Sequence, residues 1–248
     1  MKEILSQRKT IRKYSDKKVD IQLIDELLKL AAQSSNTGNM QAYSVVVTTA
    51  DQLKKQLAPA HFNQPMVINA PVVLTFCADF NRFSQWCEQR DAVPGYNNFQ
   101  SFMAAAIDAV IFAQTFVVAA ESEGLGICYL GTTTYNAAEI IDVLNLPALV
   151  VPVTTITVGY PAENPPLTDR LPLESIVHYE QYSDYSTEKI DLLYAEKENS
   201  GFYRKFVAEN NKLTLAQVFT DVRYTKQANE FFSEKFIEVL KKQGFMKE

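Results

Sequence analysis

FMAAAIDAVIFAQTFVVAA, residues Phe102 to Ala120, is the stretch that decides the fold. Its length approaches the roughly 20 residues that a membrane-spanning helix needs, but Asp108 and Gln114 interrupt it and basic flanks are missing. We therefore expect a buried helix from about Asn98 to Ser122. Because this helix is apolar on nearly every side, it should be enclosed in a large core or in the interface between two subunits.

The segments around this helix alternate between strand and helix patterns, as in a layered α/β or α+β domain. The run Ala70 to Ala78 is continuously apolar, which predicts a strand buried on both faces. Asp20 should cap the helix that follows it, and Asn136 with Glu139 resembles a capping box. The predicted strands are 43–49, 70–78, 128–131 and 150–161, and the other predicted helices are 21–32, 51–58, 136–144 and one within 228–245.

The composition is that of an ordinary folded protein. The 248 residues are 47% hydrophobic and 21% charged, far from the composition of disordered chains. Three spaced cysteines without a Cys-x-x-Cys motif and only two histidines favour neither a disulfide framework nor a metal site. We expect Cys128 to be a buried small hydrophobe, and His61 and His178 to be ordinary, partly exposed side chains. The N-terminus has no apolar secretory segment, so we expect a cytoplasmic protein.

Positive charge is concentrated at the front of this acidic chain. Residues 1–18 carry a local charge of +5, whereas residues 19–248 carry −10. Three interpretations compete: a solvated surface, a nucleic-acid-binding arm, and a site for one small phosphate. The acidic remainder argues against a polyanionic partner. In extended backbone Arg8, Thr10 and Arg12 point to the same side, where two guanidiniums and a hydroxyl can bind one phosphate.

The same stretch carries a resemblance. RKTIRKY (8–14) resembles the motif Arg-[Arg/His]-Ser-[Ile/Val]-Arg-x-[Phe/Tyr] that opens the nitroreductase superfamily of flavin enzymes, and SSNTGNMQAYSVVV (34–47) is similar to its small-residue loop before a strand. FCADFNR (76–82), GLGICYLG (124–131) and GYPAENPPLTDRLP (159–172) resemble the branch of oxygen-insensitive NADPH nitroreductases and NADPH-flavin oxidoreductases. Five ordered motifs between residues 4 and 245 are more specific than any one of them.

The resemblance implies an α+β, layered α/β fold of the nitroreductase type. Its central mixed sheet would be flanked by helices, and the long buried helix would lie in the dimer interface. The chain would form a single domain, 1–248, in which 160–248 is an extended arm plus a helical C-terminal excursion.

The resemblance also implies FMN, bound between the two subunits of a homodimer with shared active sites. Arg8, Thr10 and Arg12 would contact the phosphate, the ribityl chain and the pyrimidine end of the ring, where a fixed cation stabilises the charge of the reduced flavin. In the loop that reaches the partner's flavin, the implied FMN contacts are Ser35, Asn36, Thr37 and Asn39. In the loop that passes N5, they are Tyr129, Leu130, Gly131 and Thr132. The remaining implied contacts are Gln64, near the ribityl chain or the ring edge, and Arg170.

The implied function is an FMN-dependent NAD(P)H oxidoreductase. It would reduce nitroaromatics, quinones or free flavin, two electrons at a time, by a ping-pong mechanism, and no catalytic acid or base is assigned because the cofactor carries the chemistry. The alternatives are a non-enzymatic flavin carrier or redox sensor, and a superfamily member with specialised reductive chemistry. The electron acceptor and the choice between NADH and NADPH stay open.

Two positions depart from the motifs. Thr168 stands where the branch has lysine, so one phosphate cation is missing, and either FMN binds more weakly or Lys9 compensates. Thr132 stands where the branch has a second glycine, which adds a hydroxyl near N5. Candidates for the nicotinamide 2'-phosphate are Arg204, Lys205, Lys212 and Arg223, and no motif chooses among them.

Overall fold

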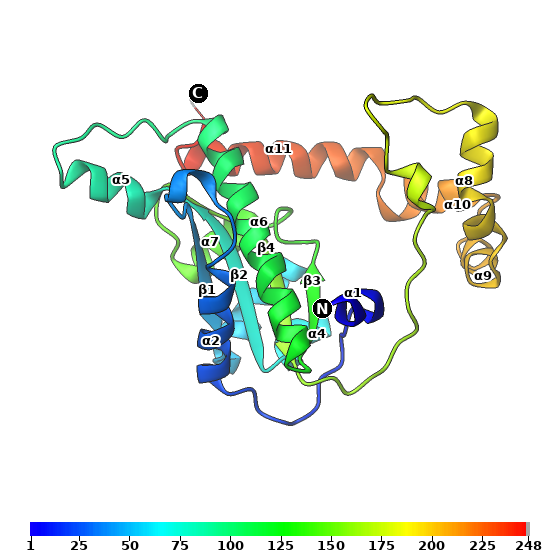
Figure 1. Cartoon of the computed structure of the whole chain (residues 1–248), viewed down its shortest axis with the longest axis horizontal. Coiled ribbons are helices and arrows are strands. Elements are labelled where there is room, and N and C mark those ends of the chain that lie inside the picture. Colours follow the sequence, from blue (N-terminus) through cyan, green and yellow to red (C-terminus); the bar gives the residue numbers. More distant parts are fainter. Residues whose placement is uncertain (247–248) are drawn as a thin grey trace. The chain divides into compact units, whose positions relative to one another are not determined.

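The computed structural model describes residues 1–246, which divide into two compact units (Figure 1). The first unit comprises Met1–Pro166 together with the segment that starts at Phe232, and the second is Leu167–Phe231. The expected single domain with an excursion after residue 160 stays a prediction.

A four-stranded sheet forms the centre of the first unit (Figure 1). Its strands are β1 (Tyr43–Thr48), β2 (Val72–Asp79), β3 (Gly126–Leu130) and β4 (Val150–Gly159), in the spatial order β1-β2-β4-β3. The α+β class is confirmed, but the expected mixed sheet is corrected, because every neighbouring pair of these strands is antiparallel. β2 and β3 run in the same direction, yet β4 lies between them, so no two parallel strands are neighbours.

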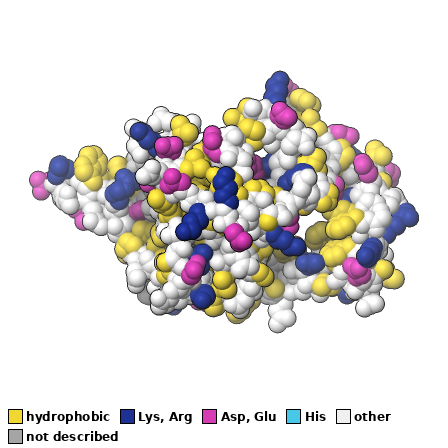
Figure 2. All heavy atoms as spheres, turned by 90° about the horizontal axis from the view of Figure 1, so that it is seen from below, with side chains coloured by type: hydrophobic (Ala, Val, Ile, Leu, Met, Phe, Trp, Pro, Cys, Tyr) yellow, Lys and Arg dark blue, Asp and Glu magenta, His cyan; other side chains and the backbone are white. Residues whose placement is uncertain are grey.

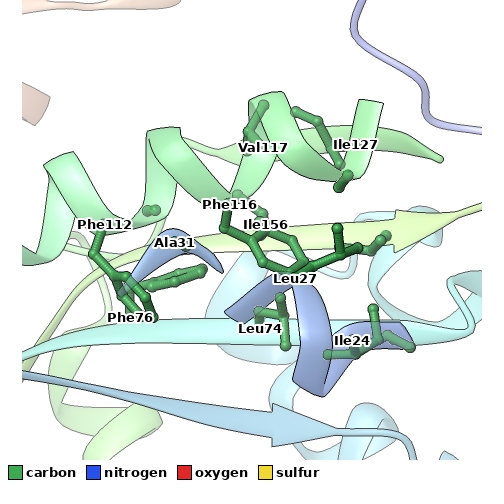
Figure 3. Close-up of a cluster of buried hydrophobic side chains, with 14 of the residues drawn as sticks. Ile24, Leu27, Ala31, Leu74, Phe76, Phe112, Phe116, Val117, Ile127 and Ile156 are labelled. Carbon is green, nitrogen blue, oxygen red and sulfur yellow. The ribbon is translucent and has the colours of Figure 1, made fainter. Parts of the chain in front are cut away.

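Two helices cover one face of this sheet. They are α2 (Ile21–Ala31) and α6 (Phe99–Ser122), which contact each other, and α6 also contacts all four strands. In Figure 3, Phe112, Phe116 and Val117 of α6 lie beside side chains of α2 and the sheet, and this cluster is buried. Every residue of β2 is buried, as its apolar sequence predicts. The long helix starts and ends within one residue of its predicted limits.

Of the two helix caps that the sequence predicts, one is present in the structure and the other is not. The Asp20 carboxylate accepts a hydrogen bond from the Gln22 N–H at 3.0 Å, so the predicted cap of α2 is confirmed. The predicted capping box of α7 (Ala137–Leu144) is wrong, because Asn136 makes no side-chain cap bond. Its side chain instead donates to the Ala60 carbonyl at 2.8 Å and accepts from Lys235 Nζ at 2.8 Å.

The remaining helices of the first unit are short, except the last. They are α1 (Lys2–Gln7), α3 (Asp51–Leu57), α4 (Pro65–Asn69), α5 (Asn81–Glu88) and, at the C-terminal end, α11 (Lys226–Lys242), whose part from Phe232 onward belongs to this unit. Val239 and Leu240 of α11 and the following Phe245 are buried in a cluster with Phe80 and Phe102. The C-terminal helix is therefore part of the core.

The face of α6 that points away from the sheet is apolar and exposed. Met103, Ile107, Val110 and Ile111 follow one another on this face, with Ile107 54% and Val110 48% exposed. Among the helices of residues 1–246, α6 alone is long and apolar enough to cross a membrane, and 44% of its most apolar window is buried. The sheet side of the helix is thus enclosed as expected, and its place in a subunit interface stays a prediction.

The second unit is helical. Its helices are α8 (Thr187–Asn199), α9 (Gly201–Glu209) and α10 (Leu215–Val218), and α10 begins with a complete capping box between Thr214 and Gln217. Asp169 ties the preceding extended segment to these helices, since its carboxylate accepts from Lys197 Nζ and Tyr203 Oη, both at 2.8 Å.

Candidate functional site

Residues 8–14, which we call the strap, are fixed to the edge of the sheet beside β3. The strap follows α1 without helical structure, the Ile11 N–H donates to the Ile127 carbonyl at 2.9 Å, and Thr10 forms a parallel bridge with Ile127. At its far end Tyr14 Oη lies 2.6 Å from Thr157 Oγ1 of β4, and burial raises the pKa of this phenol. The expected extended backbone at residues 8–12 is therefore confirmed.

Gly126 of β3 has no side chain, and this leaves room for the strap. A Cβ added at Gly126 would lie 2.7 Å from Cβ and Cγ1 of Ile11, closer than non-bonded carbon atoms approach. Gly126 is thus required by the close approach of the strap.

Replacing Gly126 with alanine should displace the strap. Overpacking of this kind costs about 1–3 kcal/mol of unfolding free energy, and here it acts on Ile11, whose N–H joins the strap to β3. We expect a loss of that size in urea unfolding and faster hydrogen exchange at the Ile11 amide. The matched control is Gly131→Ala, because a Cβ there meets no atom within 4 Å. Unchanged exchange at Ile11 in the Gly126 variant would contradict this role.

The cations of the strap have different partners. Arg8 Nε lies 3.4 Å from Glu121 Oε1 of α6, and burial raises the pKa of this carboxyl. Lys9 Nζ donates to Asn164 Oδ1 at 2.7 Å. The Arg12 N–H donates to Glu163 Oε1 at 2.6 Å, whereas the Arg12 guanidinium has no ion-pair partner within residues 1–246. Arg8 is therefore the one strap cation in an ion pair within residues 1–246, whereas Lys9, Arg12 and Lys13 are in none.

A small cavity lies next to the start of the strap. Its volume is about 250 Å³, and Arg8, Lys9, Glu121 and Gly126 contribute to its lining. It is smaller than the roughly 300–1,000 Å³ of typical cofactor pockets. This cavity can hold at most part of a cofactor.

The loop after β3 brings predicted residues next to a histidine. Tyr129 and Leu130 end β3, with Tyr129 Oη donating to Gln114 Oε1 at 3.2 Å, and burial raises the Tyr129 pKa to about 12. Gly131 is exposed, and Thr132 Oγ1 lies 2.8 Å from His61 Nδ1. Gln64 is the N-cap residue of α4, and its N–H donates to the His61 carbonyl at 3.2 Å.

The interpretation of His61 as a partly exposed side chain is wrong. Its side chain is fully buried, and burial lowers its pKa to about 4. Its partner Thr132 is 71 residues away in the chain, so no local pattern could have shown the contact. His178 is partly exposed, as expected, and Cys128 is buried.

Acid should destabilise the fold through His61. The folded-state pKa of about 4 lies below the ordinary value of 6.5, so its contribution to stability is complete above pH 6.5 and is lost as the pH falls toward 4. The difference corresponds to about 3 kcal/mol. We expect the decrease in unfolding free energy between pH 7 and pH 4, measured in urea, to be smaller by most of this amount in His61→Leu. An equal decrease in both proteins would contradict the assignment.

The small-residue loop is held by a carboxylate of the long helix. The Thr37 N–H donates to both carboxylate oxygens of Asp108 at 3.0 Å, and Thr37 Oγ1 donates to Oδ1 at 3.0 Å. Asn36 Oδ1 accepts from the Gln41 N–H at 3.2 Å, while Ser35 and Asn39 are exposed. Asp108 is a positioning residue that the sequence interpretation missed, although one carboxylate inside an apolar helix was a visible signal.

The predicted contacts therefore form three groups in the first unit. Arg8, Thr10 and Arg12 lie on the strap beside β3, which ends in Tyr129 and Leu130. Gln64 and Thr132 are connected through His61. The 35–39 loop is anchored on α6, and within residues 1–246 no hydrogen bond or ion pair joins it to the strap. Arg170 belongs to the second unit, where its Nη1 donates to the Thr168 and Asp169 carbonyls at 3.1 and 2.8 Å.

No group of three or more histidine, cysteine, aspartate or glutamate side chains within residues 1–246 could hold a metal ion. The three cysteines are free and buried.

Comparisons with known proteins agree with the motifs. Residues 5–160 match the model of the Nitroreductase family. A Cr(VI) reductase of Pseudomonas sp. (strain G-1) is 30% identical over 99% of this chain and 98% of its own length. An FMN reductase (NADPH) of Bacillus subtilis is 33% identical over 73% of this chain and 74% of its own. A crystal structure from Bacteroides fragilis is 57% identical, with a TM-score of 0.97, and the alignment covers 98% of this chain and 99% of that one.

Proposed function

This chain belongs to the nitroreductase family, and on that premise we propose that it is an FMN-dependent NAD(P)H oxidoreductase. The observation that carries the proposal is the strap, which holds Arg12, whose guanidinium is in no ion pair within residues 1–246, beside the strand that ends in Tyr129 and Leu130. The relative named as an NADPH-dependent FMN reductase supports both the flavin and the nucleotide.

The residues present fit FMN. The strap offers guanidiniums and a hydroxyl, which suit phosphate and the polar edge of a flavin ring. Gly131 leaves open space that no protein atom fills, so backbone can approach a planar ring there. Arg8 keeps donors for a phosphate oxygen while its Nε faces Glu121. These residues, together with Gln64 and Thr132, would hold the cofactor.

When bound, FMN would supply the hydride and two-electron chemistry that links NAD(P)H to a second substrate. The residues of the chain would bind the cofactor and orient it. Arg12 would supply a permanent positive charge at the pyrimidine end of the ring, where it would stabilise the negative charge of the reduced flavin. Tyr129 stays protonated at neutral pH, because burial raises its pKa to about 12. Its phenol therefore donates to Gln114 and fixes the end of β3.

We further propose a homodimer in which the exposed face of α6 is the interface. An exposed stripe of Met103, Ile107, Val110 and Ile111 is unusual on a monomer, and a second copy would cover it. Asp108 on the same helix anchors the Thr37 loop, so dimer formation would place this loop near the partner's flavin. Three free cysteines are consistent with a cytoplasmic location.

Flavin content and its reduction test the proposal. The purified protein should be yellow, and NADPH or NADH should bleach the bound flavin in stopped flow, with steady NAD(P)H oxidation once an acceptor is present. The acceptors to compare are a nitroaromatic, a quinone, free FMN and chromate, the last because of the relative named as a Cr(VI) reductase. Bound flavin that neither nucleotide bleaches would instead indicate a carrier or sensor.

The nucleic-acid alternative has little support. On the face shown in Figure 2, Lys and Arg side chains (dark blue) are interspersed with Asp and Glu side chains (magenta). A polyanion binds a continuous basic surface. Binding of duplex DNA at low salt that is lost when salt is added would support the nucleic-acid alternative.

A further inference from the structure

His61 and Thr132 form a buried polar pair beside the loop that follows β3. His61 Nδ1 and Thr132 Oγ1 are 2.8 Å apart. The other ring nitrogen, Nε2, is buried and has no hydrogen-bond partner within residues 1–246. Thr132 is partly exposed, whereas His61 is fully buried. The pair therefore connects the protein interior with the surface of the loop.

The unpaired nitrogen decides which group donates. A neutral imidazole carries one N–H and one lone pair, and burial keeps this ring neutral by lowering its pKa to about 4. A hydrogen on Nε2 would leave a buried N–H without an acceptor, which is the rarer and costlier defect. A hydrogen on Nδ1 leaves only a lone pair unused. His61 thus donates to Thr132.

This direction leaves the Thr132 hydroxyl hydrogen available. A hydroxyl has one hydrogen to donate and two acceptor sites, and His61 occupies one of the acceptor sites. Next to Thr132, Gly131 has open space around its Cα. We infer that the Thr132 hydroxyl donates a hydrogen bond to an acceptor atom of bound FMN, and that His61 is the positioning residue that fixes this direction. The inference rests on the proposed function.

The segment that carries His61 is held in place. Asn136 Nδ2 donates to the Ala60 carbonyl at 2.8 Å, and Lys235 Nζ donates to Asn136 Oδ1 at 2.8 Å. The next two residues, Phe62 and Asn63, both have a φ of 54°, in the left-handed region, which is unusual for Phe and more often adopted by Asn. The Phe62 ring contacts Tyr135, which follows the Thr132 loop, at a centroid distance of 6.4 Å. The His61–Thr132 pair is therefore held in a fixed position.

Flavin titrations of the apo-protein test the inference. Fluorescence quenching gives dissociation constants for FMN and for riboflavin, which lacks the phosphate. Thr132→Val should weaken FMN binding about tenfold, the loss of roughly one hydrogen bond, while Thr132→Ser should bind like the wild type. His61→Leu should reproduce the loss, and His61→Asn, which offers an N–H in place of Nδ1, should restore binding. A loss with both flavins places the acceptor on the ring or ribityl chain, and a loss with FMN alone places it on the phosphate.

The double variant separates positioning from a general structural effect. His61→Leu combined with Thr132→Val should bind FMN no more weakly than Thr132→Val alone, because both changes remove the same bond. The absorption bands of the bound flavin report its surroundings even if stability changes. Wild-type affinity in Thr132→Val, or tighter binding in His61→Leu, would overturn the inference. A wild-type protein that binds no flavin would overturn the proposed function instead.

Discussion

Ile107→Glu should convert the proposed dimer into monomers and release the flavin. Ile107 is 54% exposed in the isolated chain and lies in the centre of the apolar stripe of α6. In a two-fold symmetric interface each subunit contributes the same patch, so the substitution introduces two carboxylates into one apolar contact. Each unpaired buried charge costs several kcal/mol. We expect the dimer dissociation constant to rise by roughly a thousandfold, or about 4 kcal/mol.

Sedimentation over a dilution series measures this change, and absorbance measures the flavin that remains bound. The control is Leu192→Glu on α8, which places the same charge at another apolar helix position, 74% exposed. The control should behave like the wild type in both measurements. A fully flavinated dimer of the Ile107 variant would refute the α6 interface.

Asp108→Ala should unlock the loop around Thr37 and destabilise the fold. Asp108 is 2% exposed, and its carboxylate accepts from both the N–H and the hydroxyl of Thr37. Hydrogen bonds to charged groups contribute about 1.5–3 kcal/mol each, and unpaired buried donors add to the cost. We expect a loss of about 3 kcal/mol in urea unfolding, together with much faster hydrogen exchange at the Thr37 amide.

Two further variants separate the loop from the fold. Asp108→Leu replaces the carboxylate by an apolar side chain in an apolar helix, a change that often restores stability. It should therefore fold well and still lose flavin affinity, because the loop stays unlocked. Thr37→Val removes only the hydroxyl and should show a smaller effect of about 1 kcal/mol. A Leu variant that binds FMN as tightly as the wild type would show that the anchor has no part in the site.

The parts of the fold that the sequence predicted are those that depend on neighbouring residues. The apolar run 102–120 predicts α6, and the apolar run 70–78 predicts β2. The strap was also predictable, because alternating side chains in extended backbone follow from local geometry. For each of these elements, the sequence pattern that predicts it lies in the element's own residues and their neighbours.

The parts that could not be predicted depend on distant partners. Thr37 and Asp108 are 71 residues apart, as are His61 and Thr132, and Lys235 contacts Asn136 across 99 residues. The local sequence predicts that Asn136 caps a helix, but its side chain donates to the Ala60 carbonyl and accepts from Lys235 Nζ. The antiparallel order likewise depends on β4 inserting between β2 and β3. Tertiary contacts override local preference in each case.

The position of α11 has a consequence for biosynthesis. Lys235 holds Asn136, the Phe232 ring stacks on Tyr135 at a centroid distance of 4.4 Å, and Phe245 is fully buried. A nascent chain emerges from the ribosome N-terminal end first, so these supports appear only after residues 1–231 have been synthesised. Until then Phe80 and Phe102 lack part of their cover, and the chain exposes apolar surface that chaperones recognise. The hydrophobic cluster around Phe80 and Phe102 is therefore completed only once residues 232–245 have been synthesised.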